Sequence, residues 1–156
     1  DPRMQCWTSP FHPSLFLLTT VMSTRPGAWF VLDSGLKAQS TDSGAPVAVA
    51  TVPEYVAAAT ARAADAEGAV IPFAHETGTF GSSLAPFTVK GVSDEHTTMV
   101  PRNALAPSPA MPALGTKVLM LPGHCDPFVN HYDWMVAMSR GVVVGVWRLA
   151  ARSPGQ

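Results

Sequence analysis

Short apolar runs separated by turn residues dominate the hydrophobic pattern of this chain. Residues 15–22 are aliphatic and β-branched, which is typical of a buried strand, and the pair Pro26-Gly27 predicts a turn after them within 23–27. Runs of the same kind predict further strands at residues 28–32, 47–52, 69–73, 86–92 and 117–121. Near the end, two β-rich runs at 134–138 and 141–147 flank Ser139-Arg140-Gly141, which predicts a hairpin.

One segment departs from the strand pattern. Residues 53–67 are Ala-rich, with Pro53 suited to a first helical turn and Gly68 placed after the end, so we expect a helix there. No internal repeat interrupts the series of strands. The predicted fold class is therefore mainly β, a barrel or sandwich with at most one or two short helices.

Proline marks the irregular parts of the chain. Residues 1–14 carry Pro2, Pro10 and Pro13 and are expected to form an irregular segment leading into one domain over residues 15–153. The stretch 101–115 contains four prolines and is expected to be an exposed loop. The chain begins at Asp1 rather than at Met, so we expect that a preceding part is missing.

Composition adds an expectation about the surface. Hydrophobic residues make up 47% and charged residues 13%, and the charged share is about half of the ~25% usual in globular domains. We therefore expect another domain or subunit to cover part of this surface. The net charge of −1 without a basic cluster excludes a nucleic-acid partner. The run at 15–22 is shorter than the ~20 residues of a membrane span, so we expect no membrane partner and a cytoplasmic location.

The segment 122–127, Pro-Gly-His-Cys-Asp-Pro, is the most informative polar motif. In an extended backbone the side chains of His124 and Asp126 point the same way, while Cys125 points to the other side. An imidazole and a carboxylate together suit a divalent ion such as Mn²⁺ or Zn²⁺, which can polarise a substrate hydroxyl. Two alternatives remain open from the residues alone. His124 and Asp126 could simply form a turn without metal, or Cys125 could join His124 as a zinc ligand.

A second polar cluster, Ser93-Asp94-Glu95-His96, follows an apolar run. Asp94, Glu95 and His96 could orient ligands or waters around a metal, and an acidic surface turn is the alternative. The three lysines show no sign of the desolvated pocket that a Schiff-base lysine needs. The tryptophans in strand runs, at positions 29, 134 and 147, are expected in the core.

Several blocks, in order, resemble the C-terminal domain of the D-threonine aldolase / D-serine dehydratase family, whose members are alanine-racemase-like pyridoxal-phosphate enzymes. The most specific block is 122–127 with Val129-Asn130 and Asp133-Trp134, and the resemblance extends over residues 11–153. The other blocks are 15–23 with Arg25-Pro26, 33–38 with 42–44, 93–96, and the closing residues 141, 146–147 and 150–152. Their order favours His124 and Asp126 as metal ligands over a simple turn.

The resemblance implies a two-domain enzyme. An N-terminal barrel would carry pyridoxal phosphate on a lysine, and the C-terminal β-domain would close the active site, usually in a homodimer. The divalent metal, Mn²⁺ or Zn²⁺, would bind a histidine and a residue two positions on. We expect Cys125, Asp94, Glu95 and His96 to contact the metal's ligands or the substrate. An aspartate at the second ligand position, as in Asp126, is similar to the aldolase branch, and a cysteine there is similar to the dehydratase branch.

The implied substrate is a D-β-hydroxy amino acid, which is cleaved to glycine and an aldehyde or loses its hydroxyl by elimination. This chain contains no barrel and no cofactor lysine, so we expect it to be inactive on its own. Two rival hypotheses are a catalytically inactive β-domain that serves metal binding or dimerisation, and a small metallohydrolase using His96, His124 and Asp126.

Overall fold

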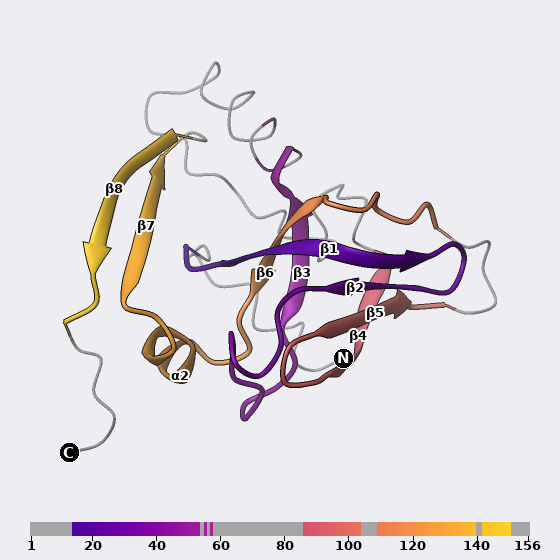
Figure 1. Ribbon diagram of the computed structural model, residues 1–156, viewed down its shortest axis with the longest axis horizontal. Coiled ribbons are helices and arrows are strands. Elements are labelled where there is room, and N and C mark those ends of the chain that lie inside the picture. The colour runs from indigo at the N-terminus through magenta and orange to yellow at the C-terminus, as the bar shows by residue number, and fades with distance from the viewer. Residues whose placement is uncertain are drawn as a thin grey trace, which may run out of the picture.

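The computed structural model describes residues 14–53, 55, 57, 86–103, 109–139 and 142–150. Its main feature is an antiparallel sheet of six strands in the order β3-β6-β1-β2-β5-β4. A separate two-stranded hairpin, β7-β8, stands beside the sheet, and the short helix α2 lies at its base (Figure 1). The elements are β1 (Leu17–Arg25), β2 (Trp29–Leu32), β3 (Val47–Thr51), β4 (Phe87–Val92), β5 (Thr97–Pro101), β6 (Lys117–Leu121), α2 (Cys125–Asn130), β7 (Trp134–Ser139) and β8 (Val142–Arg148).

The six-stranded sheet curls toward a half-barrel. Its two edge strands, β3 and β4, approach each other although they are the outermost members of the strand order. Irregular register in β1 between Val21 and Ser23, and in β4 between Val89 and Gly91, increases the local twist. The expected mainly β, barrel-like fold class is confirmed.

The core lies on the concave side of this sheet. In β1 the burial alternates, because Leu17, Thr19 and Val21 are buried while Leu18 and Met22 are exposed. Phe30 of β2 and Phe87 of β4 meet edge to face, with their ring centroids 5.0 Å apart. The buried apolar cluster consists of Leu17, Val21, Phe30, Leu32, Phe87, Met99, Val118, Met120 and Phe128.

The predicted strands correspond closely to the observed ones, with two differences. β1 continues through the expected turn to Arg25, because residues 23–25 pair with β2. β5 was not predicted, although it supplies buried Met99 and Thr97. Residues 52, 53, 55 and 57 are helical at the start of the expected helix. The rest of that helix and the strand expected at 69–73 lie outside the described residues.

Helix α2 is a further element that the pattern did not predict. Pro127 occupies its third position, where a missing N–H costs nothing because no intrahelical partner exists there. Phe128 is buried and contacts Tyr132, which donates a hydrogen bond of 2.8 Å to the carbonyl of Ala38. These contacts fix the C-terminal end of α2 against the core and the loop that follows β2. Within the described residues no helix is long and apolar enough to cross a membrane.

The hairpin β7-β8 carries large apolar side chains on both faces. Trp134 is 57% exposed and Trp147 is 60% exposed, so the expectation that these two tryptophans lie in the core is wrong. Trp29 is only half-buried. The other exposed apolar residues of the hairpin are Val136, Met138, Val142, Val143, Val144 and Val146. Because both faces are exposed, neither one packs against the core that the described residues form.

Candidate metal site

The segment that contains His124 lies beside a second loop that is distant in sequence. Strand β3 pairs antiparallel with β6, and Val47 stands opposite Leu121. The residues just before β3 and just after β6 therefore meet at one end of the sheet. This pairing brings the loop 42–44 against the segment 122–126.

Two glycines let the loop and the segment approach closely. A Cβ added at Gly123 would lie 2.1 Å from the carbonyl oxygen of Gly44, which no real side chain tolerates. Gly44 itself has a φ of 130°, a conformation that favours glycine. The backbones therefore touch at Gly44 and Gly123, and this contact fixes the loop directly beside His124.

His124 is held on one ring nitrogen and faces Asp126 with the other. Its Nδ1 lies 2.9 Å from Oδ2 of Asp42 and 3.1 Å from Oγ of Ser43. Its Nε2 lies 3.7 Å from Oδ2 of Asp126. His124 has an extended backbone as the N-cap of α2, whereas Asp126 belongs to the first helical turn. The expectation of an extended backbone through Asp126 is therefore wrong, although the two side chains still face each other.

The three side chains differ in their exposure to solvent. His124 is 36% exposed, Asp42 is 55% exposed and Asp126 is 96% exposed. The pKa of Asp42 is lowered from its ordinary value, first by a hydrogen bond from Ser40 and then by the one from His124. Asp42 is therefore a carboxylate at neutral pH. The outward-facing Asp126 leaves the Nε2 side of the imidazole open to solvent and to a ligand.

The donor set fits a divalent cation in a two-ligand arrangement. Metal–ligand bonds of about 2.1 Å can bridge two donor atoms up to roughly 4.2 Å apart, and Nε2 and Oδ2 are 3.7 Å apart. One imidazole and one carboxylate suit Mn²⁺ or Zn²⁺. Among the described residues no group of three His, Cys, Asp or Glu converges on one point. Remaining coordination positions would therefore belong to water or substrate.

Cys125 is a free, exposed thiol at the first position of α2. It lies between the two candidate ligands in the sequence. An exposed thiol can still bind zinc, so two donor sets are available, His124 with Asp126 and His124 with Cys125. A variant at position 125 distinguishes them.

The turn 93–96 packs against a different loop. The N–H groups of Leu36 and Lys37 donate to the carbonyls of Ser93 and Asp94, at 2.8 and 3.0 Å. Lys37 also forms an ion pair with Glu95. Within the described part of the chain, the polar contacts of Asp94, Glu95 and His96 are made inside this turn or with that loop, and none reaches His124 or Asp126. Their suggested role around the metal stays a prediction.

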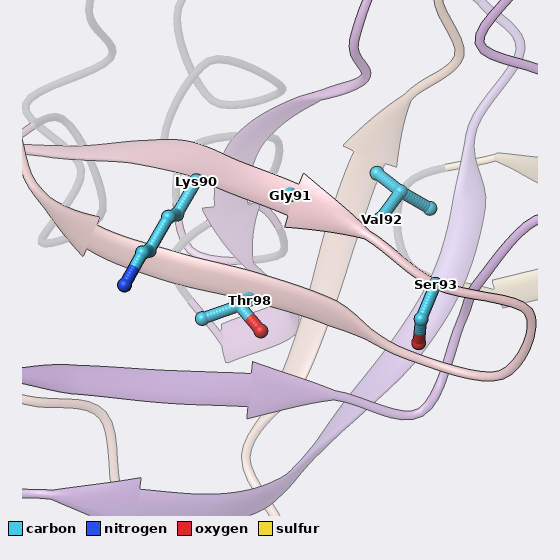
Figure 2. A pocket seen from close by; sticks show the side chains of 5 residues that line it. All are labelled: Lys90, Gly91, Val92, Ser93 and Thr98. Atoms are coloured by element: carbon cyan, nitrogen blue, oxygen red, sulfur yellow. The ribbon is translucent and has the colours of Figure 1, made fainter.

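An open surface depression of about 360 Å³ lies on the β4-β5 hairpin (Figure 2). It is lined by Lys90, Gly91, Val92, Ser93 and Thr98. None of these residues belongs to the pair His124 and Asp126. The depression is therefore separate from the candidate metal site.

Asp42 and Ser43 are the site residues that sequence reasoning missed. In the sequence they belong to a turn-rich stretch, Asp42-Ser43-Gly44, with no residue type that demands a ligand role. The only available signal was that this stretch forms one of the ordered blocks of the family resemblance. Their contact with His124 depends on the pairing of β3 with β6, which local patterns do not reveal.

Comparison with known proteins identifies the family. A family model described as "Putative serine dehydratase domain" matches residues 14–138. The chain therefore belongs to this serine dehydratase domain family, and the resemblance inferred from the ordered blocks is confirmed.

The individual relatives are lyases of β-hydroxy amino acids. The chain is 31% identical over 142 residues to a 3-hydroxy-D-aspartate aldolase of Paracoccus denitrificans, and 28% identical over 148 residues to a D-threonine aldolase of Arthrobacter sp.. These matches cover 91% and 94% of this chain but only 27% and 29% of the relatives. The chain thus spans less than a third of the length of these curated relatives.

Solved structures give the same fold. The chain superposes on a D-threonine aldolase from Filomicrobium marinum with a TM-score of 0.61 and 26% identity, over 92% of this chain and 29% of that one. A D-threo-3-hydroxyaspartate dehydratase from Delftia sp. HT23 superposes with a TM-score of 0.57 at 17% identity, over 90% of this chain and 32% of that one. The second likeness concerns the fold alone.

Proposed function

We propose that this chain is the metal-carrying C-terminal domain of a pyridoxal-phosphate-dependent lyase that acts on D-β-hydroxy amino acids. The observation that carries the proposal is the facing pair of His124 Nε2 and Asp126 Oδ2, 3.7 Å apart at the end of the sheet where β3 begins and β6 ends. Family membership and the two aldolase relatives support the substrate class.

The two ligands have distinct roles in this proposal. His124 supplies a neutral nitrogen donor and the exposed Asp126 supplies a charged oxygen donor, so that Mn²⁺ or Zn²⁺ is held with positions free for a substrate oxygen. A bound cation polarises such an oxygen and lowers the pKa of the hydroxyl that it carries. An aspartate two positions after the histidine favours the aldolase reaction, which yields glycine and an aldehyde, over elimination.

Pyridoxal phosphate does not fit the described residues of this chain. All three lysines, Lys37, Lys90 and Lys117, are exposed. Lys37 is engaged by Glu95, and Lys117 donates to Thr20 over 2.7 Å. A Schiff-base lysine needs a desolvated pocket, so we place the cofactor on an N-terminal barrel of the full-length enzyme. The homodimer and the cytoplasmic location stay predictions.

The proposal is tested by divalent-metal binding to the 156-residue chain. We expect calorimetry to detect binding of Mn²⁺ or Zn²⁺, and we expect Asp126→Ala to weaken it by at least about tenfold because one of two protein ligands is lost. The matched control is Cys125→Ser at the neighbouring position, which should leave the affinity unchanged. Loss of binding in the cysteine variant, with Asp126→Ala unaffected, would instead identify a His-Cys site.

The inactive β-domain is the second candidate function, and the exposed apolar hairpin favours it. It predicts a domain that associates with a partner without contributing to turnover. Mixing this chain with the barrel domain of a related aldolase and assaying D-threonine cleavage distinguishes the two. Metal-dependent release of glycine supports the lyase domain, and association without turnover supports the inactive domain.

A further inference from the structure

The imidazole of His124 has two chemically different neighbours. On one side a carboxylate oxygen of Asp42 lies 2.9 Å from Nδ1. On the other side Nε2 faces Asp126 at 3.7 Å, which is too long for a hydrogen bond. A neutral imidazole carries its single proton on one nitrogen only, and the other nitrogen offers a lone pair. Which nitrogen has the proton therefore decides whether Nε2 can bind a cation.

The contact at Nδ1 settles this choice. The Asp42 side chain is 55% exposed, and an exposed carboxyl group is ionised at neutral pH, so it can only accept a hydrogen bond. An unprotonated Nδ1 would place a lone pair against a carboxylate oxygen at 2.9 Å. Of the two neutral tautomers, only the one with the proton on Nδ1 makes this contact favourable, and in that tautomer the lone pair of Nε2 points toward Asp126.

We propose that Asp42 is a positioning residue that holds His124 in the Nδ1–H tautomer and thereby presents Nε2, together with Asp126, to a divalent cation. This inference rests on the proposed metal site and assigns a role to a residue outside the His124-Asp126 pair. Metal-bound histidines commonly donate their second N–H to a carboxylate, and loss of such a partner costs about 10- to 100-fold in metal affinity.

Ser43 cannot replace Asp42 in this role. Its hydroxyl lies 3.1 Å from the same nitrogen but can either donate or accept, so it is compatible with both tautomers. The carboxylate of Asp42 accepts only. The backbone contact between Gly44 and Gly123 fixes the distance between the loop and the imidazole ring. This contact keeps the carboxylate of Asp42 next to Nδ1, where it selects the tautomer.

The contact is expected to matter little for stability. Asp42 is 55% exposed and His124 is 36% exposed, and exposed ion pairs contribute little to folding. If Asp42 had a purely structural role, its substitution would leave the tautomer of His124 and the metal affinity unchanged. A positioning role predicts a change in both without a large change in the unfolding midpoint.

The test compares Asp42→Asn with Ser43→Ala in the full 156-residue chain. The ¹⁵N chemical shifts of the His124 ring report the tautomer without metal, and calorimetry with Mn²⁺ at high salt reports the affinity while long-range charge effects are screened. Asparagine can donate to Nδ1 as well as accept from it, so Asp42→Asn should lower the population of the Nδ1–H form and weaken Mn²⁺ binding by about 10- to 100-fold. Ser43→Ala should change neither quantity.

Two results would overturn the inference. One is an Nε2–H tautomer in the unmodified chain. The other is an Asp42→Asn variant with unchanged ring shifts and unchanged affinity. Absence of Mn²⁺ binding by the unmodified chain would instead reject the proposed metal site, and the ring shifts, which need no metal, would still show whether Asp42 selects the tautomer.

Discussion

At the scale of single residues, Asp33 links the end of β2 back to β1. Its Oδ1 accepts hydrogen bonds from the hydroxyl of Thr19, at 2.6 Å, and from the N–H of Thr20, at 2.7 Å. Partial burial raises the pKa of Asp33, but these hydrogen bonds outweigh it, so the pKa lies below its ordinary value of 3.8. The ionised form therefore favours the folded state.

This shift predicts a pH-dependent effect of Asp33→Asn. Because the folded pKa is depressed, the stabilisation is fully present well above the unfolded pKa and is lost as the pH falls through the folded value. At neutral pH we expect the variant to lose about 1 kcal/mol, since the charged acceptor is replaced by a neutral one at a solvent-exposed position. Urea unfolding of both proteins at several pH values measures this, and a difference that does not shrink in acid contradicts it.

The candidate ligands could be predicted from the sequence, whereas their partner could not. Only Cys125 separates His124 from Asp126 in one distinctive motif, so their proximity needs only local geometry. Asp42 lies far from them in the chain and reaches His124 only through the pairing of Val47 with Leu121. A single sequence does not specify which residues of β3 and β6 pair with each other.

At the scale of elements, the close approach of Gly44 and Gly123 predicts the effect of one methyl group. Gly123→Ala would place a Cβ 2.1 Å from a backbone oxygen, so one of the two segments must move. We expect a loss of about 1–3 kcal/mol in unfolding free energy, together with weaker Mn²⁺ binding because the loop that carries Asp42 is displaced.

The matched control for this substitution is Gly91→Ala in β4. A Cβ at Gly91 meets nothing within 4 Å, so its effect should stay within about 0.5 kcal/mol. Thermal unfolding and calorimetry of the two variants give the comparison. Equal stability and equal metal affinity in both would show that the glycine contact does not fix the loop.

Most strands were easier to predict than helix α2 or strand β5. Runs such as 117–121 are continuous and apolar, and the pattern located β6 correctly. Helix α2 has only six residues, two of them Asp126 and Pro127, and no apolar repeat long enough to show a helical period. Strand β5 ends in Pro101, which favoured a loop in the pattern.

At the scale of the whole molecule, the exposed hairpin β7-β8 predicts self-association of the isolated chain. Both of its faces carry large apolar side chains, and contiguous patches of this kind mark interaction surfaces. We expect concentration-dependent association in sedimentation experiments. The triple variant Val136→Thr, Val144→Thr and Val146→Thr keeps β-branched side chains and should weaken association by about tenfold or more.

Leu114→Ser provides the control for the association experiment. Leu114 is 68% exposed in a turn outside the hairpin, so its replacement should leave the association constant unchanged. If the triple variant associates as strongly as the unmodified chain, the hairpin is not the surface responsible.

The strand pairing that assembles the candidate site also has a kinetic consequence. Asp42 and His124 come together only after β3 has found β6 across the intervening residues 52–116. Contacts of such long sequence separation form late, because the entropy of closing the loop must be overcome first. For the proposed metal site, a nascent or partly refolded chain would therefore reach full metal affinity only after β3 and β6 have paired, and the onset of that affinity during refolding would report this pairing.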